Sequence, residues 1–399
     1  MARDRWKLRG LLTLVVGFSL LGCAASAGNS GARDPNSAPG RVATPGSPAV
    51  EVPTTYVSPT GATTIAEMFE RAKVLLLGGR FLEAASGFDR IVALEPTGTY
   101  VTASMFNAGL AFDQVEDRKN AMARFRDLAK RFPEAPETHH ALVRMLRILA
   151  WQEAWSELAS TADVLLAHAG LTPVERVEAH GARALGAVEL NDLDTATMHV
   201  SKARTIVEDL RLDDGGRLPL GSAPVFFALG EVRRLQGERI TFVPVPSDFA
   251  KVLEDRCQLL LDAQDAYSQA MRTYDAHWGA MSGYRVGQLY QQLHRDLLAI
   301  PSPSTAKTDK QKQLFEGAMR LRYRVLIEKG MEMMDRTLRM AERTGERSSW
   351  VSRAKDAKAD LTRALAQEKE ALARLPFSEA DLKQALEDLA KKKAGAANP

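Results

Sequence analysis

Cysteine and histidine, which act as nucleophiles and metal ligands in many sites, are rare in this sequence. The 399 residues include two cysteines and seven histidines. Cys23 directly follows a short apolar run, residues 11–21, and the basic stretch MARDRWKLR precedes that run. A run of this length cannot span a bilayer, which takes about 20 apolar residues. Basic residues followed by such a run are typical of an export signal that is later removed, so residues 1–22 are predicted to be a signal peptide. The alternative is a short buried core helix, but polar, Pro- and Gly-rich sequence follows at once.

The residues Leu20-Leu21-Gly22-Cys23 resemble the bacterial lipobox. The resemblance implies that the Cys23 thiol receives a diacylglyceryl group and that cleavage before Cys23 frees its amine for a further acyl chain. One acyl chain holds a protein only marginally at a membrane, whereas two or three hold it stably. Ala24 stands where an Asp often retains such proteins at the inner membrane. The resemblance therefore implies an anchor in the outer membrane that faces the periplasm. The alternative is an unmodified cysteine in an ordinary signal core.

The histidines and the second cysteine suggest no catalytic or metal site. His139 and His140 are adjacent, and a helix points adjacent side chains about 100° apart, which is poor geometry for one metal ion. Cys257 lies in the helical pattern DRCQLLLDA, as a small core residue would. There is no HExxH, CxxC or GxSxG, and the stretches GGRF and DDGG lack the strand–loop–helix context of a phosphate site. We therefore predict no enzyme activity, cofactor, metal ion or small-molecule substrate.

The charge distribution argues against a nucleic-acid partner. The formal net charge is +3, and residues 1–22 alone account for this excess, so the remainder is close to neutral. The stretch AMRLRYRVL, residues 318–326, is locally basic around Tyr323. Nearby acids are predicted to pair with arginines at helical spacing, giving a solvated face: Glu328, Glu332 and Asp335 with Arg324, Arg336 and Arg339.

Residues 23–62 are predicted to be a lipid-anchored disordered linker. They are rich in Pro, Gly, Ser, Ala and Thr and show no apolar period. Such a segment cannot bury enough surface to offset the entropy of ordering. A flexible chain of this length has an r.m.s. reach of roughly 35 Å, which would let the folded part stand off the membrane.

Two segments further on repeat the same pattern of small, aromatic and proline residues. Residues 72–96 and 105–133 share it, and their final prolines, Pro96 and Pro133, are 37 residues apart. The matching residues are Gly79, Phe81, Ala84, Phe88 and Pro96 in the first, and Gly109, Phe112, Ala121, Phe125 and Pro133 in the second. Small residues let two antiparallel helices approach closely, aromatic residues fill the gap to the next pair, and proline ends the second helix. The pattern resembles the tetratricopeptide repeat (TPR), which has about 34 residues per unit.

Weaker units extend the predicted solenoid to residues 63–249, with about five repeats. Residues 138–166 keep Ala154 at a small site, and residues 179–207 keep Ala184 and Ala196. A fifth first helix is expected at residues 225–238, with its partner helix displaced by a proline-bearing loop at 238–249.

In a TPR stack the first helices line a concave face, and the resemblance implies which residues would form a peptide groove. They are Phe69, Lys73, Leu76 and Leu77 in the first repeat, Phe106, Leu110, Asp113 and Gln114 in the second, and His139 and Arg147 in the third. Phe69 and Phe106 occupy equivalent sites, so a partly apolar groove for an extended or helical peptide is predicted. The alternative is that a neighbouring helix fills this groove.

The C-terminal half is predicted to be helical. Residues 250–300 would form an irregular extension of two helices, residues 301–390 a C-terminal helical region, and residues 391–399 a disordered tail. Met319, Tyr323, Leu326, Gly330 and Met333 mark an apolar seam on a helix expected at 311–344. Ser378 with Asp381 is expected to cap the last helix.

The mature chain as a whole resembles TPR lipoproteins from myxobacteria and their relatives, through YRVGQLYQQLHRDLLAIPSP and the segment RYRVLIEKGMEMMDRTLRM. That group includes an outer-membrane component of a gliding-motility machine. The resemblance implies a scaffold that docks envelope proteins into a machine for gliding motility or for outer-membrane or secretion assembly. The alternative is an adaptor or regulator of peptidoglycan synthesis.

Overall fold

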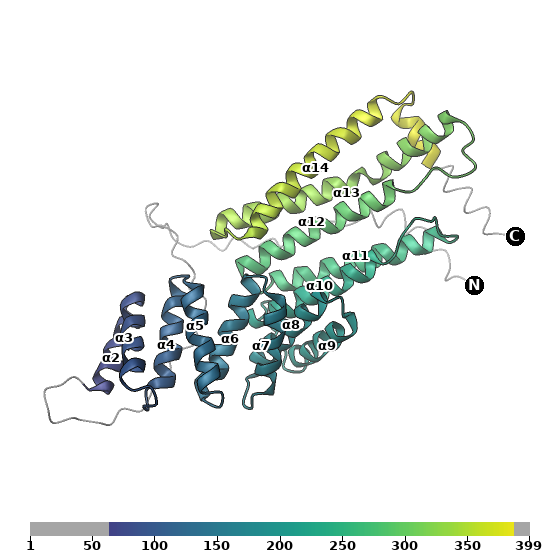
Figure 1. Ribbon diagram of the computed structural model, residues 1–399. Coiled ribbons are helices and arrows are strands. Elements are labelled where there is room, and N and C mark those ends of the chain that lie inside the picture. Colours follow the sequence, from purple (N-terminus) through teal and green to yellow (C-terminus); the bar gives the residue numbers. More distant parts are fainter. Residues whose placement is uncertain (1–63, 387–399) are drawn as a thin grey trace. The chain divides into compact units, whose positions relative to one another are not determined.

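The computed structural model describes residues 64–386 (Figure 1). Within that range the chain forms α-helices, one short 3-10 helix and connecting turns, and no strand. The all-α fold class predicted from the sequence is therefore confirmed. No helix in this range is both long enough and apolar enough to cross a membrane. The predicted signal peptide, Cys23, the linker of residues 23–62 and the tail of residues 391–399 lie outside the described residues.

Eight consecutive helices form four hairpins along the chain (Figure 1). Their bounds, pair by pair, are α2 (Ile65–Leu77) with α3 (Phe81–Leu94), α4 (Val101–Gln114) with α5 (Arg118–Arg131), α6 (Pro136–Trp151) with α7 (Trp155–Ala167), and α8 (Pro173–Glu189) with α9 (Leu193–Asp209).

All four hairpins are closed by the same turn of three residues. The middle residue has a positive φ in each, at Gly79 (76°), Glu116 (61°), Glu153 (57°) and Asn191 (56°). The next residue donates its N–H to the carbonyl five residues earlier, with N···O distances of 2.8–3.0 Å: Arg80 to Leu75, Asp117 to Phe112, Ala154 to Leu149 and Asp192 to Ala187. Only glycine adopts a positive φ without steric cost. At Glu116 and Glu153 the packing of the two helices therefore imposes the conformation.

Inside the hairpins, small residues meet aromatic rings, as the sequence pattern predicts. A Cβ at Gly109 of α4 would collide with the ring of Phe125 on α5. The same ring lies 5.9 Å, centroid to centroid, from Phe106, and in the first hairpin Phe69 packs edge-on against Phe88 at 5.5 Å. All four phenylalanines are fully buried. These contacts fix how closely the two helices of each pair approach.

A fifth hairpin uses the same device with a longer connection. The 3-10 helix η1 (Leu220–Ser222) leads into α10 (Ala223–Glu238), which packs against α11 (Phe249–Met271). A Cβ at Gly230 of α10 would lie 2.5 Å from Cε1 of Tyr267 on α11, the counterpart of the Gly109–Phe125 contact. The displaced partner helix is thus α11. The predicted domain boundary between residues 249 and 250 falls between two helices that pack against each other.

The remaining helices pack on one another as a further unit. α12 (Ala276–Leu298) lies along α13 (Asp309–Thr344), and α14 (Ser349–Ala373) covers both. Gly287 and Gly330 let α12 and α13 approach closely, since a Cβ at Gly287 would lie 3.2 Å from the Gly330 carbonyl oxygen. The predicted boundary between residues 300 and 301 falls in the connection between these two helices.

Two local predictions in this region have different outcomes. Ser378 and Asp381 form the expected cap: the Ser378 backbone N–H donates to Asp381 Oδ2 at 2.8 Å. The expected pairing of Asp335 with Arg339 gives way to an ion pair between α13 and α14, Asp335 Oδ1 to Lys358 Nζ, at 2.6 Å. Arg324–Glu328 and Arg336–Glu332 pair within α13 as predicted.

Gly230→Ala tests the fifth hairpin. The added Cβ meets a ring that cannot move aside, because the Tyr267 hydroxyl donates to buried Glu231 at 2.6 Å. We expect a net loss of about 1–3 kcal/mol in the free energy of unfolding, measured by urea denaturation followed by circular dichroism. Gly279→Ala on α12 is the matched control: its Cβ would meet only the flexible end of Met340, at 3.2 Å, so it should be neutral or slightly stabilising. Equal tolerance of both changes would contradict the assigned packing.

Candidate functional site

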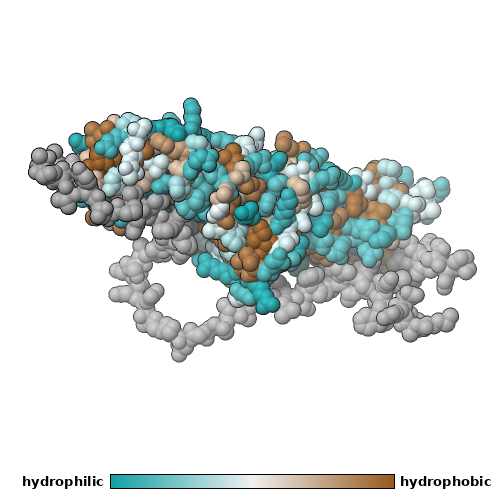
Figure 2. All heavy atoms as spheres, turned by 90° about the horizontal axis from the view of Figure 1, so that it is seen from below, coloured by the Kyte–Doolittle hydropathy of each residue, from teal (hydrophilic) through white to brown (hydrophobic). Residues whose placement is uncertain are grey.

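The candidate site lies on the first helices of the four repeats, α2, α4, α6 and α8. The surface that these helices present, with the contacts between them, is called the first-helix face. Neighbouring first helices contact one another directly, α2 with α4, α4 with α6 and α6 with α8. On the side of the molecule shown in Figure 2, hydrophobic residues form separate groups between hydrophilic ones.

The two aromatic residues predicted to line a groove do not do so. Phe69 and Phe106 each have 0% of their surface exposed. They point at the second helix of their own hairpin, where they pack against Phe88 and Phe125. A buried ring cannot contact a docked peptide, so this prediction is wrong. Leu76 and Leu110 are buried as well.

Other predicted residues remain accessible on the first-helix face. Leu77 is 73% exposed at the end of α2, and Gln114 is exposed at the end of α4. Lys73 is half-buried, and its Nζ lies 3.8 Å from Glu70 Oε2.

Asp113 and Arg147 are tied to neighbouring first helices. Arg144 Nη1 of α6 lies 3.5 Å from Asp113 Oδ2 of α4, and burial raises the pKa of the Asp113 carboxyl. Arg147 of α6 makes two bonds to Glu178 of α8, with N···O distances of 2.7 and 2.9 Å. The Glu178 carboxylate raises the pKa of Arg147. Charged pairs thus fasten three successive first helices.

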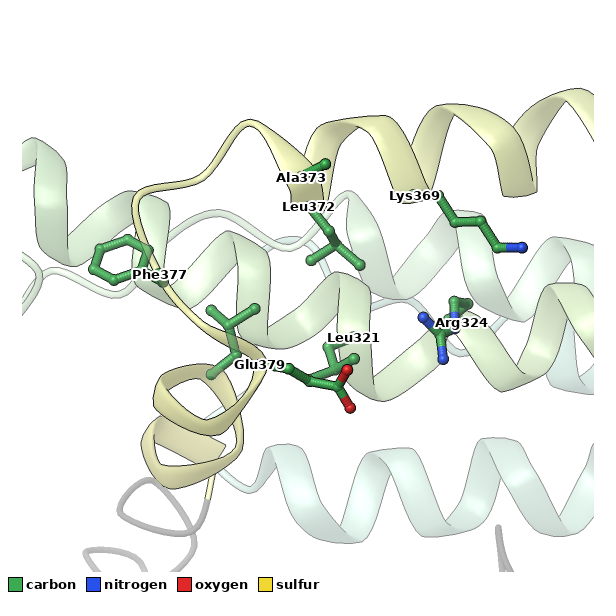
Figure 3. Close-up of a pocket in the computed structure, with 8 residues that line it drawn as sticks. Leu321, Arg324, Lys369, Leu372, Ala373, Phe377 and Glu379 are labelled. Atoms are coloured by element: carbon green, nitrogen blue, oxygen red, sulfur yellow. The ribbon is translucent and has the colours of Figure 1, made fainter.

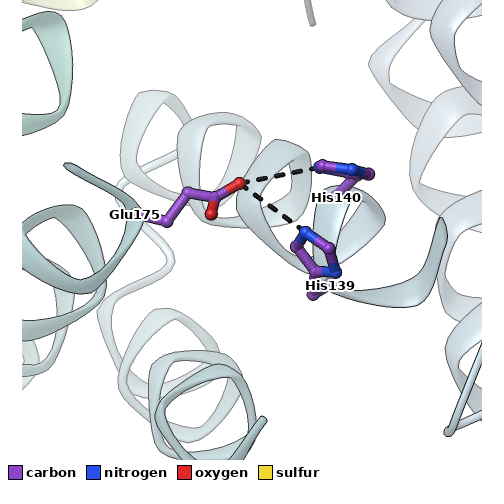
Figure 4. Close-up of side chains that lie close together, drawn as sticks. All are labelled: His139, His140 and Glu175. Atoms are coloured by element: carbon purple, nitrogen blue, oxygen red, sulfur yellow. Dashed lines mark ion pairs between the residues drawn. The ribbon is translucent and has the colours of Figure 1, made fainter. Parts of the chain in front are cut away.

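His139 and His140 come together despite being adjacent on α6 (Figure 4). Their ring centroids are 3.9 Å apart, and both face the Glu175 carboxylate of α8. Glu175 Oε1 lies 3.8 Å from His139 Nε2 and 3.6 Å from His140 Nδ1. The potential ligand atoms of the three side chains all lie within 4.8 Å of one another. The expectation that these histidines diverge too far to share an ion is wrong, because their side-chain torsions bring the rings together.

A second histidine pair was missed by the sequence analysis. His180 Nδ1 of α8 lies 2.9 Å from His199 Nδ1 of α9, and both side chains are buried. Each stands one residue before the site that holds a phenylalanine in the first two hairpins. Aligning the hairpins on their turns would therefore have placed the two histidines opposite each other. Burial, followed by the charge of the partner, lowers the pKa of His180 to about 4, and burial also lowers that of His199.

A buried carboxylate joins the fifth hairpin to the C-terminal helices. Glu231 of α10 accepts a hydrogen bond from Tyr267 of α11 and lies 2.7 Å from Arg234 and 2.8 Å from Arg285 of α12. Burial works to raise the pKa of Glu231, but the two guanidinium groups and the tyrosine lower it overall. No sequence motif predicted this cluster.

The C-terminal helices reach the repeats at the third turn. Ser349 Oγ and Arg353 Nη2 of α14 each donate to Glu153 Oε1 at 3.0 Å. Trp151 at the end of α6 lies beside His277 of α12, with ring centroids 6.2 Å apart. The C-terminal helices α12 and α14 therefore contact the end of α6 and the turn that follows it.

A small hollow lies at the far end of the C-terminal helices (Figure 3). Its volume is about 240 Å³, below the range of about 300–1,000 Å³ usual for ligand pockets. Arg324, one of its two basic residues, already pairs with Glu328 at 3.3 Å. The hollow is lined by Leu321, Arg324, Lys369, Leu372, Ala373, Phe377, Glu379 and Leu382. Cys257, the other cysteine, is half-buried away from it, and burial raises the pKa of its thiol.

Comparison with known proteins finds similar solved structures but no family. No protein-family model and no curated protein matches the chain. Among solved structures, it is similar to a tetratricopeptide repeat protein from Parabacteroides merdae ATCC 43184, with 14% identity and a TM-score of 0.39 over 75% of this chain and 98% of that chain. The TPR-type architecture rests on the repeated turns and the small-to-aromatic contacts described above.

The His180–His199 pair predicts a pH dependence of stability. The folded pKa of His180, about 4, is below its ordinary value of 6.5, so the unfolded chain binds the proton more readily. The stabilisation of the folded state by neutral His180 is therefore fully present above pH 6.5 and is lost as the pH falls towards 4. His180→Gln should flatten the fall in unfolding free energy across that interval. His168→Gln, at the C-cap of α7, should keep the wild-type slope, and an unchanged slope in His180→Gln would contradict the assignment.

Proposed function

We propose that this protein is a non-catalytic scaffold that docks other proteins through its TPR-type repeats. The observation that carries the proposal is the series of four hairpins with one turn geometry. It sets α2, α4, α6 and α8 side by side, and repeated units stacked in this way present an extended binding surface. The accessible residues Lys73, Leu77 and Gln114 are the positions at which a docked segment would make contact.

We further propose that the scaffold is lipid-anchored at Cys23 in the outer membrane and faces the periplasm. The support is the lipobox-like sequence and the Pro- and Gly-rich segment after it. Such a tether would hold the repeats near the membrane and so raise their effective concentration at membrane-bound partners. In this proposal the partners are envelope proteins of a motility, secretion or outer-membrane assembly machine.

A pair of first-helix substitutions tests docking. We expect Leu77→Glu with Gln114→Glu to abolish in-cell crosslinks to specific envelope proteins, because both side chains are exposed on the first-helix face. Crosslinked complexes are purified and identified by mass spectrometry. The matched control is Val164→Glu with Met198→Glu, which changes two exposed apolar residues on the second helices α7 and α9.

The control variant should retain the partners of the wild type. Partners that persist in the first-helix variant would place docking on the C-terminal helices instead. The identity of the partners separates motility or secretion machinery from the peptidoglycan synthases of the alternative function.

Cys23→Ser tests the anchor. The serine hydroxyl cannot form the thioether that carries the diacylglyceryl group, so metabolic labelling with a fatty-acid analogue should disappear and the protein should leave the membrane fraction. Cys257→Ser is the control and should remain labelled. Labelling that survives in Cys23→Ser would refute the lipoprotein assignment.

A further inference from the structure

The His139, His140 and Glu175 cluster differs from the other charged contacts of the first-helix face. Asp113 and Glu178 each face an arginine guanidinium group. Glu175 Oε1 instead faces the imidazole rings of His139 and His140. Imidazole nitrogen and carboxylate oxygen are the donors that Zn²⁺ accepts, and two histidines with one glutamate are an established zinc ligand set.

The carboxylate is held in place by the start of α8. Thr172 and Glu175 form a capping box in which the Thr172 backbone N–H and hydroxyl each donate to Glu175 Oε2 at 2.8 Å. One oxygen is therefore fixed by the helix cap, and the other is presented to the histidines (Figure 4). A ligand oriented in this way by a neighbouring group is what a metal site needs.

The distances suit a small divalent ion with little adjustment. Bonds of about 2.0–2.1 Å in a tetrahedral site place the ligand atoms about 3.3–3.4 Å apart. The two nitrogen-to-oxygen distances are 3.8 and 3.6 Å, and all three ligand atoms lie within 4.8 Å of one another, so rotation of the side chains would close the set. His139, His140 and Glu175 are all half-buried, so an ion can reach them.

A second carboxyl group, that of Glu137, lies on the same helix as the two histidines. Glu137 lies one turn before His140 on α6 and is only 8% exposed. Its Oε2 is buried without a hydrogen-bond partner, which is costly for a carboxylate.

From this geometry we propose that His139, His140 and Glu175 form a zinc-binding site that bridges the first helices α6 and α8. Three protein ligands leave the fourth tetrahedral position open to solvent. The ion would join the third and fourth repeats at the first-helix face, beside the Arg147–Glu178 pair. Glu137 is not one of the three ligands.

Zinc titration of the full chain tests the proposal. The protein is purified without a histidine tag and with Cys23→Ser and Cys257→Ser, so that no thiol competes for the ion. Competition against a chromogenic zinc chelator should reveal one bound equivalent per chain. His139→Gln with His140→Gln should lose that equivalent. Cobalt substitution should give the visible absorption of a tetrahedral site, absent in the double variant.

The second histidine pair provides the matched control. His180→Gln with His199→Gln also removes two neighbouring imidazoles but should bind zinc like the parent. Circular dichroism of each variant shows that the helices are intact. The proposal is overturned if the parent binds no stoichiometric zinc, or if binding persists in the His139/His140 variant. Loss of binding in the His180/His199 variant alone would also overturn it.

Discussion

The close approach of two helices at a residue with little or no side chain is the contact on which the fold depends. Gly109 receives the ring of Phe125, Gly230 receives that of Tyr267, and Gly287 faces the backbone of Gly330. Each contact lies in a different hairpin, and each sets the spacing of its two helices. Because a stack of hairpins buries its core between neighbours, an error in one spacing would be passed to the next interface. The rest of the architecture follows from repeating this contact.

Polar groups between the helices are arranged around that apolar framework. Arg147–Glu178 and Asp113–Arg144 join first helices, and Glu231 collects Arg234, Arg285 and Tyr267 at the base of the C-terminal unit. Removing one partner from such a buried pair leaves an uncompensated charge and costs several kcal/mol, about 3–5 in measured cases. These pairs are therefore better regarded as specifying which helices meet than as a net source of stability.

The sequence predicted the repeats well because small, aromatic and proline residues at fixed spacing dictate local geometry. It failed where the answer depended on the orientation of a face or of a side chain. Phe69 and Phe106 were placed on the wrong side of their helices, since the same spacing suits either a groove or the hairpin interior. The angle of about 100° between His139 and His140 describes their Cα–Cβ bonds, but two further torsions decide where the rings lie. The long connections near residues 240 and 300 likewise hide from the sequence which helices are partners.

The contact of Glu153 with Arg353 has a consequence for how the chain acquires its structure. The two residues are 200 positions apart, whereas the hairpin contacts are local. Pairing across so long a separation comes late, because loop closure must precede it. The hairpins of the N-terminal repeats need no such closure and can form first. Glu153 is the left-handed middle residue of the third turn. Its carboxylate gains the hydrogen bonds from Ser349 and Arg353 only after α14 has docked. Completion of the third repeat thus waits for nearly the last helix of the chain.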